Sequence, residues 1–216
     1  MADGCCSRAA TFDGRSVAYR RVLWFVIALN AAMFMIEVGA GYLARSQALQ
    51  ADALDFLGDA ATYALTLLVI GRPSTWRANA ALFKGASLGT LALWVAGSTL
   101  SRAVQGGPPE PVTMSAVAAL ALAVNFGAAL LLFRFRDGDA NVHSVWLCSR
   151  NDAIGNVAVV LAAAGVWATG VSWPDLVVAF AMSALFLHSA TRIVRQAPGE
   201  LRHVRTATAL LGAPAR

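Results

Sequence analysis

The chain has 216 residues, of which 58% are hydrophobic and only 13% are charged. A soluble domain of this size has about 25% charged residues, so the composition excludes a soluble globular enzyme. The apolar residues lie in blocks of the length that a membrane-spanning helix needs, roughly 20 residues. The net charge of +5 does not indicate a nucleic-acid partner, because the arginines lie in the tails and alternate loops of a membrane topology.

The apolar blocks predict an all-α membrane protein with six transmembrane helices. The expected spans are residues 22–43, 47–70, 79–100, 112–133, 144–169 and 176–194. They divide the chain into a cytoplasmic N-terminal tail (1–20), a six-helix transmembrane domain (21–195) and a short cytoplasmic C-terminal tail (196–216). The first twenty residues are polar and mixed in charge, so we expect no cleavable signal peptide.

The distribution of arginine predicts the orientation. Arg45 and Arg102 fall in the loops on one side, whereas the tails and the other loops carry the remaining loop arginines. An excess of positive charge marks the cytoplasmic side of a membrane protein. We therefore expect both termini to be cytoplasmic and the location to be a bacterial plasma membrane.

Three aspartates interrupt the second span. Asp52, Asp55 and Asp59 follow one another at steps of three and four residues, which places them on one face of a helix. In the fifth span, Cys148 and Asp152 are one helical turn apart. Ionisable groups inside a bilayer usually face a bundle interior and mark an ion path. An aspartate in a span can also cap a kink or bind water, but two clusters with the same spacing favour a shared site.

The two clusters are expected to meet near the middle of the membrane. The second span enters from the outside and the fifth from the cytoplasm, so at about 1.5 Å per residue Asp59 and Asp152 reach nearly the same depth. Zn(II) takes four ligands and accepts both thiolate and carboxylate. The candidate metal ligands are Asp55, Asp59, Cys148 and Asp152, and the candidate accessory ligands are Asp52, Glu37 and Asn151.

Metal and protons should compete for such a site. Only deprotonated groups coordinate a metal, so metal binding releases protons. An empty cluster cannot hold several negative charges in a low dielectric, so some of its groups keep their protons. These ligands therefore predict the exchange of a divalent metal for protons, with zinc or cadmium as the transported metal and no resident cofactor.

Three polar features allow more than one interpretation. Glu37, inside the first span, either assists the entry of protons or metal or pairs with an arginine. Cys5 and Cys6, in the N-terminal tail, either capture a soft metal or are ordinary reduced thiols. Arg150, on the side of the fifth span away from the candidate ligands, either extends toward the headgroups or pairs with an acid.

These residues resemble the motifs of the cation diffusion facilitator family, whose members export divalent metals by proton antiport. The likeness covers most of the chain, and its strongest parts are residues 37–42, 46–53, 55–59 and 152–157. The family's second-span motif is His or Asp followed four positions later by Asp, which Asp55 and Asp59 match. The fifth-span motif is usually His followed by Asp at the same spacing, where this chain has Cys148 and Asp152.

The resemblance implies the six-helix cation-efflux transmembrane fold and a metal exporter. Cys148 stands where histidine is usual, and its softer thiolate favours Zn(II) or Cd(II) over Mn(II). The family's cytoplasmic metal-binding domain is not found in this sequence, so we expect a short variant in which any homodimer forms through the transmembrane helices. Gly85 and Gly89, four residues apart, would let another helix approach closely.

Two other functions fit part of the pattern. A non-transporting membrane metal sensor or partner subunit would account for the short chain and for the Cys5–Cys6 pair. A small exporter of organic cations would account for buried carboxylates but leaves Cys148 without a role. An enzyme is not expected, because the sequence has no activated nucleophile pair, no phosphate-binding loop and no cofactor motif.

Overall fold

A computed structural model describes residues 16–69, 74–136 and 140–211, and within these ranges it contains six α-helices and no strand. The helices are α1 (Val17–Leu43), α2 (Gln47–Val69), α3 (Ser74–Gln105), α4 (Pro111–Phe133), α5 (Ala140–Thr169) and α6 (Trp173–Leu211). The predicted all-α fold is confirmed. Cys5 and Cys6 lie outside the described residues, so the two interpretations of this pair stay open.

Four of the helices in the described part of the chain are long and apolar enough to cross a membrane. They are Val17–Leu43, Pro111–Phe133, Asp152–Thr169 within α5 and Trp173–Arg195 within α6. The other two helices, α2 and α3, are also long, at 23 and 32 residues. The three aspartates make α2 more polar than a typical span, and none of them is exposed on the outside of the fold. Burial against other helices, rather than contact with lipid, explains how α2 tolerates them.

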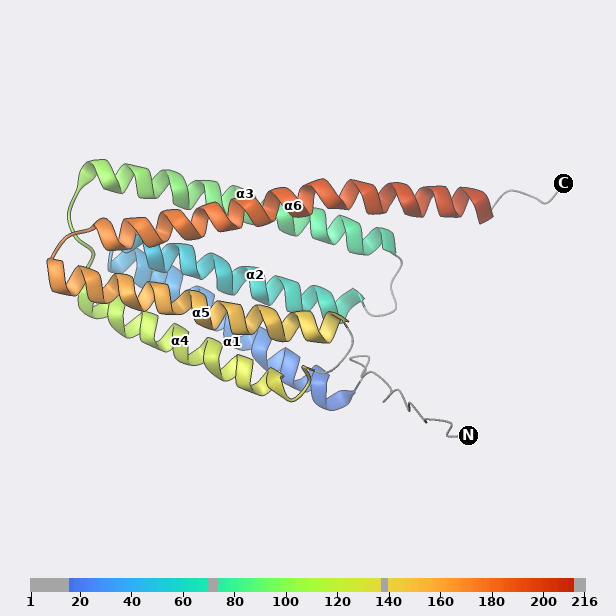
Figure 1. Cartoon of the computed structure of the whole chain (residues 1–216), viewed down its shortest axis with the longest axis horizontal. Helices are drawn as coiled ribbons and strands as arrows, with labels where there is room; N and C mark the ends of the chain where they lie inside the picture. Colours follow the sequence, from blue (N-terminus) through green and yellow to red (C-terminus); the bar gives the residue numbers. More distant parts are fainter. Residues whose placement is uncertain (1–15, 70–73, 137–139, 212–216) are drawn as a thin grey trace, which may run out of the picture.

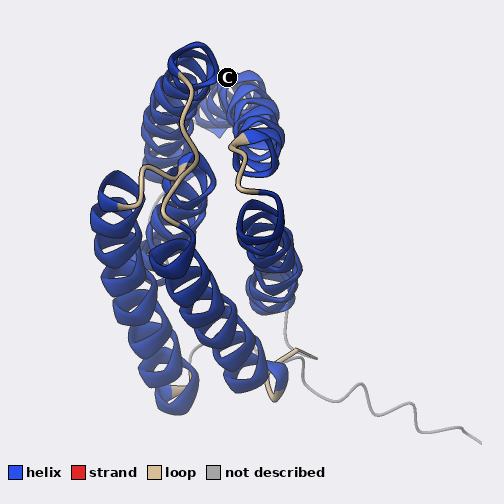
Figure 2. Cartoon of the chain, turned by 90° about the vertical axis from the view of Figure 1, so that its left-hand side faces the viewer, coloured by secondary structure: helices blue, strands red, loops and turns tan. Residues whose placement is uncertain are grey.

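The helices form a four-helix bundle with a helix pair at its side (Figure 1). The bundle consists of α1, α2, α4 and α5, and the pair α3–α6 packs against α2 and α5. The view along the helices in Figure 2 shows the same grouping. The start of α1 and the end of α6 lie at one end, which we call the terminal end. The opposite, far end carries the connections 44–46, 106–110 and 170–172.

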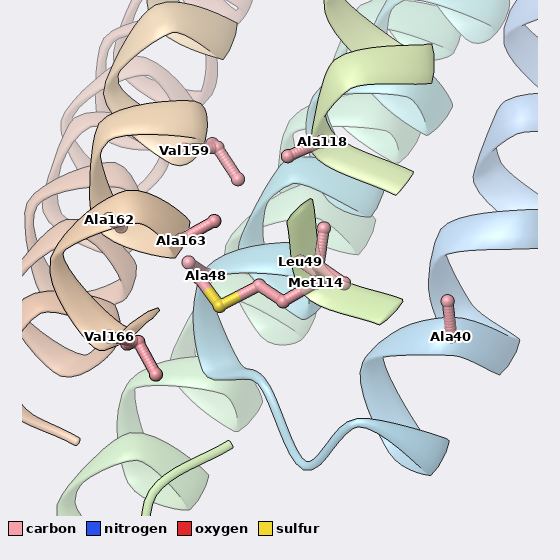
Figure 3. Close-up of a cluster of buried hydrophobic side chains, with 9 residues drawn as sticks. All are labelled: Ala40, Ala48, Leu49, Met114, Ala118, Val159, Ala162, Ala163 and Val166. Carbon is pink, nitrogen blue, oxygen red and sulfur yellow. The ribbon is translucent and has the colours of Figure 1, made fainter. Parts of the chain in front are cut away.

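Small and medium-sized apolar side chains hold the bundle together at its far end. This cluster, drawn in Figure 3, contains Ala40, Ala48, Leu49, Met114, Ala118, Val159, Ala162, Ala163 and Val166. The alanines leave little side-chain volume between α2 and α5, so the two helices pack closely there. A second cluster, nearer the terminal end, joins α1, α2 and α4 around Tyr19 and Tyr63.

Gly85 and Gly89 of α3 do allow another helix to approach, but that helix is α6 of the same chain. A Cβ atom added at Gly85 would lie 2.9 Å from Cγ2 of Ile193, and one added at Gly89 would lie 3.2 Å from Cβ of Ala190. Real Cβ atoms essentially never come as close as the first of these distances. Because the two glycines serve packing inside one chain, they do not support a homodimer through this face, and the homodimer stays a prediction.

A carboxylate of α6 holds the beginning of α2. The Ser46 hydroxyl donates to Asp175 Oδ1 at 2.6 Å, the Gln47 N–H to Oδ2 at 2.8 Å, and the Ala48 N–H to Oδ1 at 3.0 Å. The first N–H groups of a helix have no partner within the helix, so an acceptor at this position stabilises the helix start. Asp175 is buried. It thereby ties α6 to the helix that carries the aspartates.

The sixth helix is longer than the sequence predicts. The predicted span 176–194 agrees with the apolar segment Trp173–Arg195, and the helix continues beyond this span to Leu211. Pro198 removes one helical hydrogen bond, and a proline followed by Gly199 usually indicates a helix end. The residues that follow include many leucines, alanines and arginines, which favour helix and carry it beyond this point.

Candidate metal site

The acidic face of α2 lies on the inside of the fold. Asp52 is fully buried, Asp59 is 8% exposed and Asp55 is half-buried. Their spacing of three and four residues keeps them on one side of the helix. Asp52 and Asp59 are therefore shielded from the outside, and Asp55 is shielded in part.

On α5 the structure describes Asp152 but not all of its predicted neighbours. Asp152 is half-buried, and the side chain of Asn156, one turn later, donates from Nδ2 to the Asp152 backbone oxygen at 3.0 Å. Arg150 is exposed. The positions of Cys148 and Asn151 belong to α5, but their side chains lie outside the described part of the chain.

Packing at the far end indicates the relative depth of the two acids. Ala48 of α2 and Ala163 of α5 belong to the same cluster (Figure 3). The two helices run in opposite directions (Figure 1), and Ala48 is as many residues from Asp59 as Ala163 is from Asp152. At the constant rise of a helix, about 1.5 Å per residue, Asp59 and Asp152 therefore lie at about the same depth.

The described side chains alone do not form a metal site. Among them, no group of three histidine, cysteine, aspartate or glutamate side chains gathers closely enough to hold a metal ion. Cys148 is not among the side chains that this observation covers. The predicted set of Asp55, Asp59, Cys148 and Asp152 consequently stays a prediction.

Asp59 has a partner that the sequence analysis missed. The Tyr63 hydroxyl donates a hydrogen bond of 2.6 Å to Asp59 Oδ2. Tyr63 is fully buried and follows Asp59 by one helical turn, so the signal in the sequence was a tyrosine four residues after an aspartate. A hydrogen bond to one carboxylate oxygen fixes the orientation of the group.

A second acidic pair lies between α1 and α2. Glu37 and Asp52 are both fully buried, and their carboxyl groups interact with each other. None of their four carboxylate oxygens has a hydrogen-bond partner among the described residues. The interpretation that Glu37 pairs with an arginine therefore finds no support among the described residues. Asp55 adds negative charge nearby.

Three asparagines add polar atoms to the inside of the bundle. Asn30 of α1, Asn125 of α4 and Asn156 of α5 are buried, and the side-chain oxygen of each has no hydrogen-bond partner among the described residues. Buried polar atoms normally bind a protein group or an ordered water. Polar side chains that face the interior of a membrane bundle are typical of a path for water or a cation.

Comparisons with known proteins agree with these features. Residues 23–201 match the family model of the cation efflux transmembrane domain. The zinc transporter ZitB of Escherichia coli strain K12 is 28% identical over 194 residues, which cover 84% of this chain and 62% of ZitB. The metal cation efflux system protein CzcD of Cupriavidus metallidurans is 27% identical over 171 residues, 74% of this chain and 54% of CzcD.

A third relative is the cadmium, cobalt and zinc/H(+)-K(+) antiporter of Bacillus velezensis, which is 23% identical over 192 residues, 82% of this chain and 61% of that protein. The chain thus spans between 54% and 62% of the length of these relatives. The family model, in contrast, covers most of the chain. The chain therefore belongs to the cation diffusion facilitator family and is an integral membrane protein.

Proposed function

We propose that this chain exports a divalent metal ion, Zn(II) or Cd(II), across the membrane in exchange for protons. The observation that carries the proposal is the equal depth of Asp59 on α2 and Asp152 on α5, two helices that pack against each other. Two of the relatives are named for zinc transport and for antiport with H(+). These names agree with the chemistry of the side chains.

The proposed ligands are Asp55, Asp59, Cys148 and Asp152. Each of them must lose its proton to coordinate the ion, so arrival of the metal drives protons out and arrival of protons drives the metal out. Thiolate in the set favours the softer metals of the divalent series. The hydrogen bond from Tyr63 holds Asp59 ready for this exchange.

We assign Glu37 and Asp52 a proton-carrying role next to the metal path. Two interacting carboxyl groups cannot both keep a negative charge where water is excluded, so the pair holds at least one proton. Asp55 lies between Asp52 and Asp59 along α2. A positive ion bound at Asp55 would therefore favour release of the proton that Glu37 and Asp52 hold. The pair would then add to the number of protons exchanged for each metal.

We place the terminal end of the molecule in the cytoplasm. Both described chain ends lie there, which an even number of membrane crossings requires (Figure 1). Among the described arginines, Arg20, Arg21, Arg134, Arg136 and Arg195 lie toward this end as well. With this orientation in a bacterial plasma membrane, movement of the metal toward the far end is export.

Reconstituted vesicles test the proposal. The purified chain is placed in vesicles that contain a zinc-sensitive dye and a pH-sensitive dye, and Zn(II) is added outside. We expect zinc entry coupled to proton exit in the wild type and in Glu110→Gln, which changes an exposed carboxylate outside the bundle. Asp59→Asn and Asp152→Asn should abolish both signals. Wild-type flux in both variants would reject the site.

The same preparation separates the exporter from a metal sensor or partner subunit. A sensor would bind Zn(II) in a calorimetric titration but give no zinc entry in vesicles. An exporter gives both signals. An exporter of organic cations would give neither signal with Zn(II) and would not respond to replacement of Cys148.

A further inference from the structure

The far end of the molecule contains a cavity of about 620 Å³ between the end of α1, the start of α2 and the last turns of α3. Its lining includes two arginines, Arg45 and Arg102. Among the described arginines and lysines, these are the two at the far end, because the others lie near the terminal end or within α5. The two arginine side chains at the far end therefore line the same cavity.

The structure holds the two arginines next to each other. Arg45 has a left-handed backbone, with φ of 56°, in the turn between α1 and α2. Arg102 Nη2 lies 3.4 Å from the Arg45 backbone oxygen, a long hydrogen bond that brings α3 to this turn. A left-handed conformation is costly for a residue other than glycine, so surrounding contacts fix this turn. The Ser46 N–H to Gly41 oxygen bond of 2.9 Å is one of these contacts.

The acids at this end are already engaged in the fold. Asp175 accepts three hydrogen bonds from the start of α2 and also attracts Arg102 electrostatically. Glu110 accepts the N–H groups of Val112 and Thr113 at the start of α4. No carboxylate in the described ranges forms an ion pair with Arg45 or Arg102. Both arginines thus lack an ion-pair partner among the described residues, although the carboxylates of Asp175 and Glu110 lie at the same end of the fold.

The lining changes in character along α3, from the far end toward the middle of the helix. Next to the arginines lie the polar groups of Gln105, Ser101 and Ser98, and further along α3 follow the exposed side chains of Trp94 and Leu93. Leu93 lies about 13 Å from Arg102 along the helix axis, at 1.5 Å per residue. Two adjacent arginine side chains are unfavourable for the passage of a metal cation through this cavity. The arginines, the hydrogen-bonding side chains and the apolar side chains instead follow one another in the same order as the phosphate, the glycerol and the acyl chain of a phospholipid.

We propose that this cavity binds the headgroup of an anionic phospholipid, such as phosphatidylglycerol, from the leaflet at the far end. Arg45 and Arg102 bind the phosphodiester, because guanidinium groups form charge-assisted hydrogen bonds with phosphate oxygens. The polar side chains of α3 contact the glycerol, and Trp94 and Leu93 contact the start of an acyl chain. A lipid bound there links α3 to the α1–α2 turn. This proposal is independent of the metal site.

Thermal unfolding in a neutral detergent tests the assignment with three probes: short-chain phosphatidylglycerol, short-chain phosphatidylcholine and inorganic phosphate. We expect phosphatidylglycerol to raise the melting temperature of the wild type and the other two probes to have little effect. In Arg45→Gln/Arg102→Gln the apparent affinity should fall by at least about tenfold, because each charge-assisted hydrogen bond that is lost weakens binding by about that factor or more. Arg20→Gln/Arg21→Gln removes the same charge at the terminal end and should keep the effect.

Further variants and outcomes decide the identity of the occupant. Trp94→Ala should weaken the effect of phosphatidylglycerol while both arginines remain, which distinguishes a lipid from a free anion. An equal stabilisation by inorganic phosphate would overturn the lipid assignment. So would equal effects of phosphatidylglycerol on the wild type and on Arg45→Gln/Arg102→Gln. Loss of dimers in the latter variant, with no lipid effect in the wild type, would instead identify a second copy of the chain as the occupant.

Discussion

A carboxylate inside a membrane protein requires hydrogen-bond donors, a proton or a cation, and Asp59 has the first of these in Tyr63. The 2.6 Å hydrogen bond joins two buried groups on one helix face. It fixes one oxygen of the proposed metal ligand. Any effect of Tyr63 on the proposed metal ligand therefore depends on its hydroxyl oxygen alone.

Tyr63→Phe removes that oxygen and keeps the ring. We expect metal affinity to fall by about tenfold, because partners that orient a metal ligand have effects of this size. Calorimetric titration with Zn(II) measures it. Tyr42→Phe is the matched control, since the Tyr42 side chain is exposed. Equal affinities in the two variants would show that the hydroxyl does not orient a ligand.

Glu37→Gln tests the proton pair. The variant removes one of two interacting buried carboxyl groups, so we expect about one proton fewer to be released when Zn(II) binds. Proton release is measured in weakly buffered detergent solution. Asp52→Asn should give the same reduction, and the double variant should not exceed it. An unchanged proton count in both single variants would contradict the proton-carrying role.

The sequence predicts the acids of α2 better than their partners. A spacing of three and four residues is enough to place Asp52, Asp55 and Asp59 on one helix face. It does not reveal that Asp52 meets Glu37, because that contact depends on how α1 packs against α2. The Tyr63 contact is local and follows the same helical spacing, so a search for donors one turn away would have found it.

At the scale of the helix, the start of α2 depends on a residue more than a hundred positions away. Asp175→Ala leaves three buried donors without their acceptor. We expect a loss of about 2–4 kcal/mol in the free energy of unfolding, from the cap and from the unsatisfied groups. Thermal or denaturant unfolding followed by circular dichroism measures it.

Asp175→Asn provides the comparison for that measurement. Its amide oxygen still accepts hydrogen bonds, so this variant should lose less stability than the alanine variant. If the alanine and asparagine variants both unfold like the wild type, the cap does not stabilise α2. If both lose the same stability, the charge rather than the acceptor geometry is the important property.

The start of α4 gives a pH dependence outside the membrane-spanning segments. Hydrogen bonds from the hydroxyl and N–H of Thr113 and from the N–H of Val112 lower the pKa of Glu110. A lowered folded-state pKa means that the cap stabilises the fold above the ordinary glutamate pKa and stops doing so as the pH falls through the lowered value. The difference in melting temperature between wild type and Glu110→Gln should therefore shrink over that acid range. A constant difference would contradict the cap.

Helix positions were easier to predict than helix ends. Apolar blocks and turn residues gave α2 and α4 nearly to their ends, since a proline at the start of α4 and the 44–46 turn are local signals. In α6 they gave the apolar span but not the continuation of the helix past Pro198 to Leu211. They also missed the cap of α2, because Asp175 looks like an ordinary acid at the start of another helix until the two helices are packed together.

At the scale of the molecule, the pairing of α3 with α6 beside a four-helix bundle was not predictable from the sequence. Hydropathy identifies spans but carries no information about which spans touch. Gly85 and Gly89 predicted a close helix contact without saying whether the partner belongs to the same chain. The equal depth of Asp59 and Asp152, in contrast, follows from counting residues in two helices of opposite direction, and the packing of Ala48 and Ala163 agrees with it.

We propose that Cys148 and the aspartates of α2 and α5 hold one metal ion together. Cd(II) titration of a Cys5→Ser/Cys6→Ser protein tests it directly, because the cadmium–thiolate absorption then reports Cys148 alone. We predict an absorption band that saturates near one Cd(II) per chain, disappears in Cys148→Ser and weakens strongly in Asp59→Asn and in Asp152→Asn. A band of unchanged affinity in both aspartate variants would show that the thiol and the carboxylates do not share an ion.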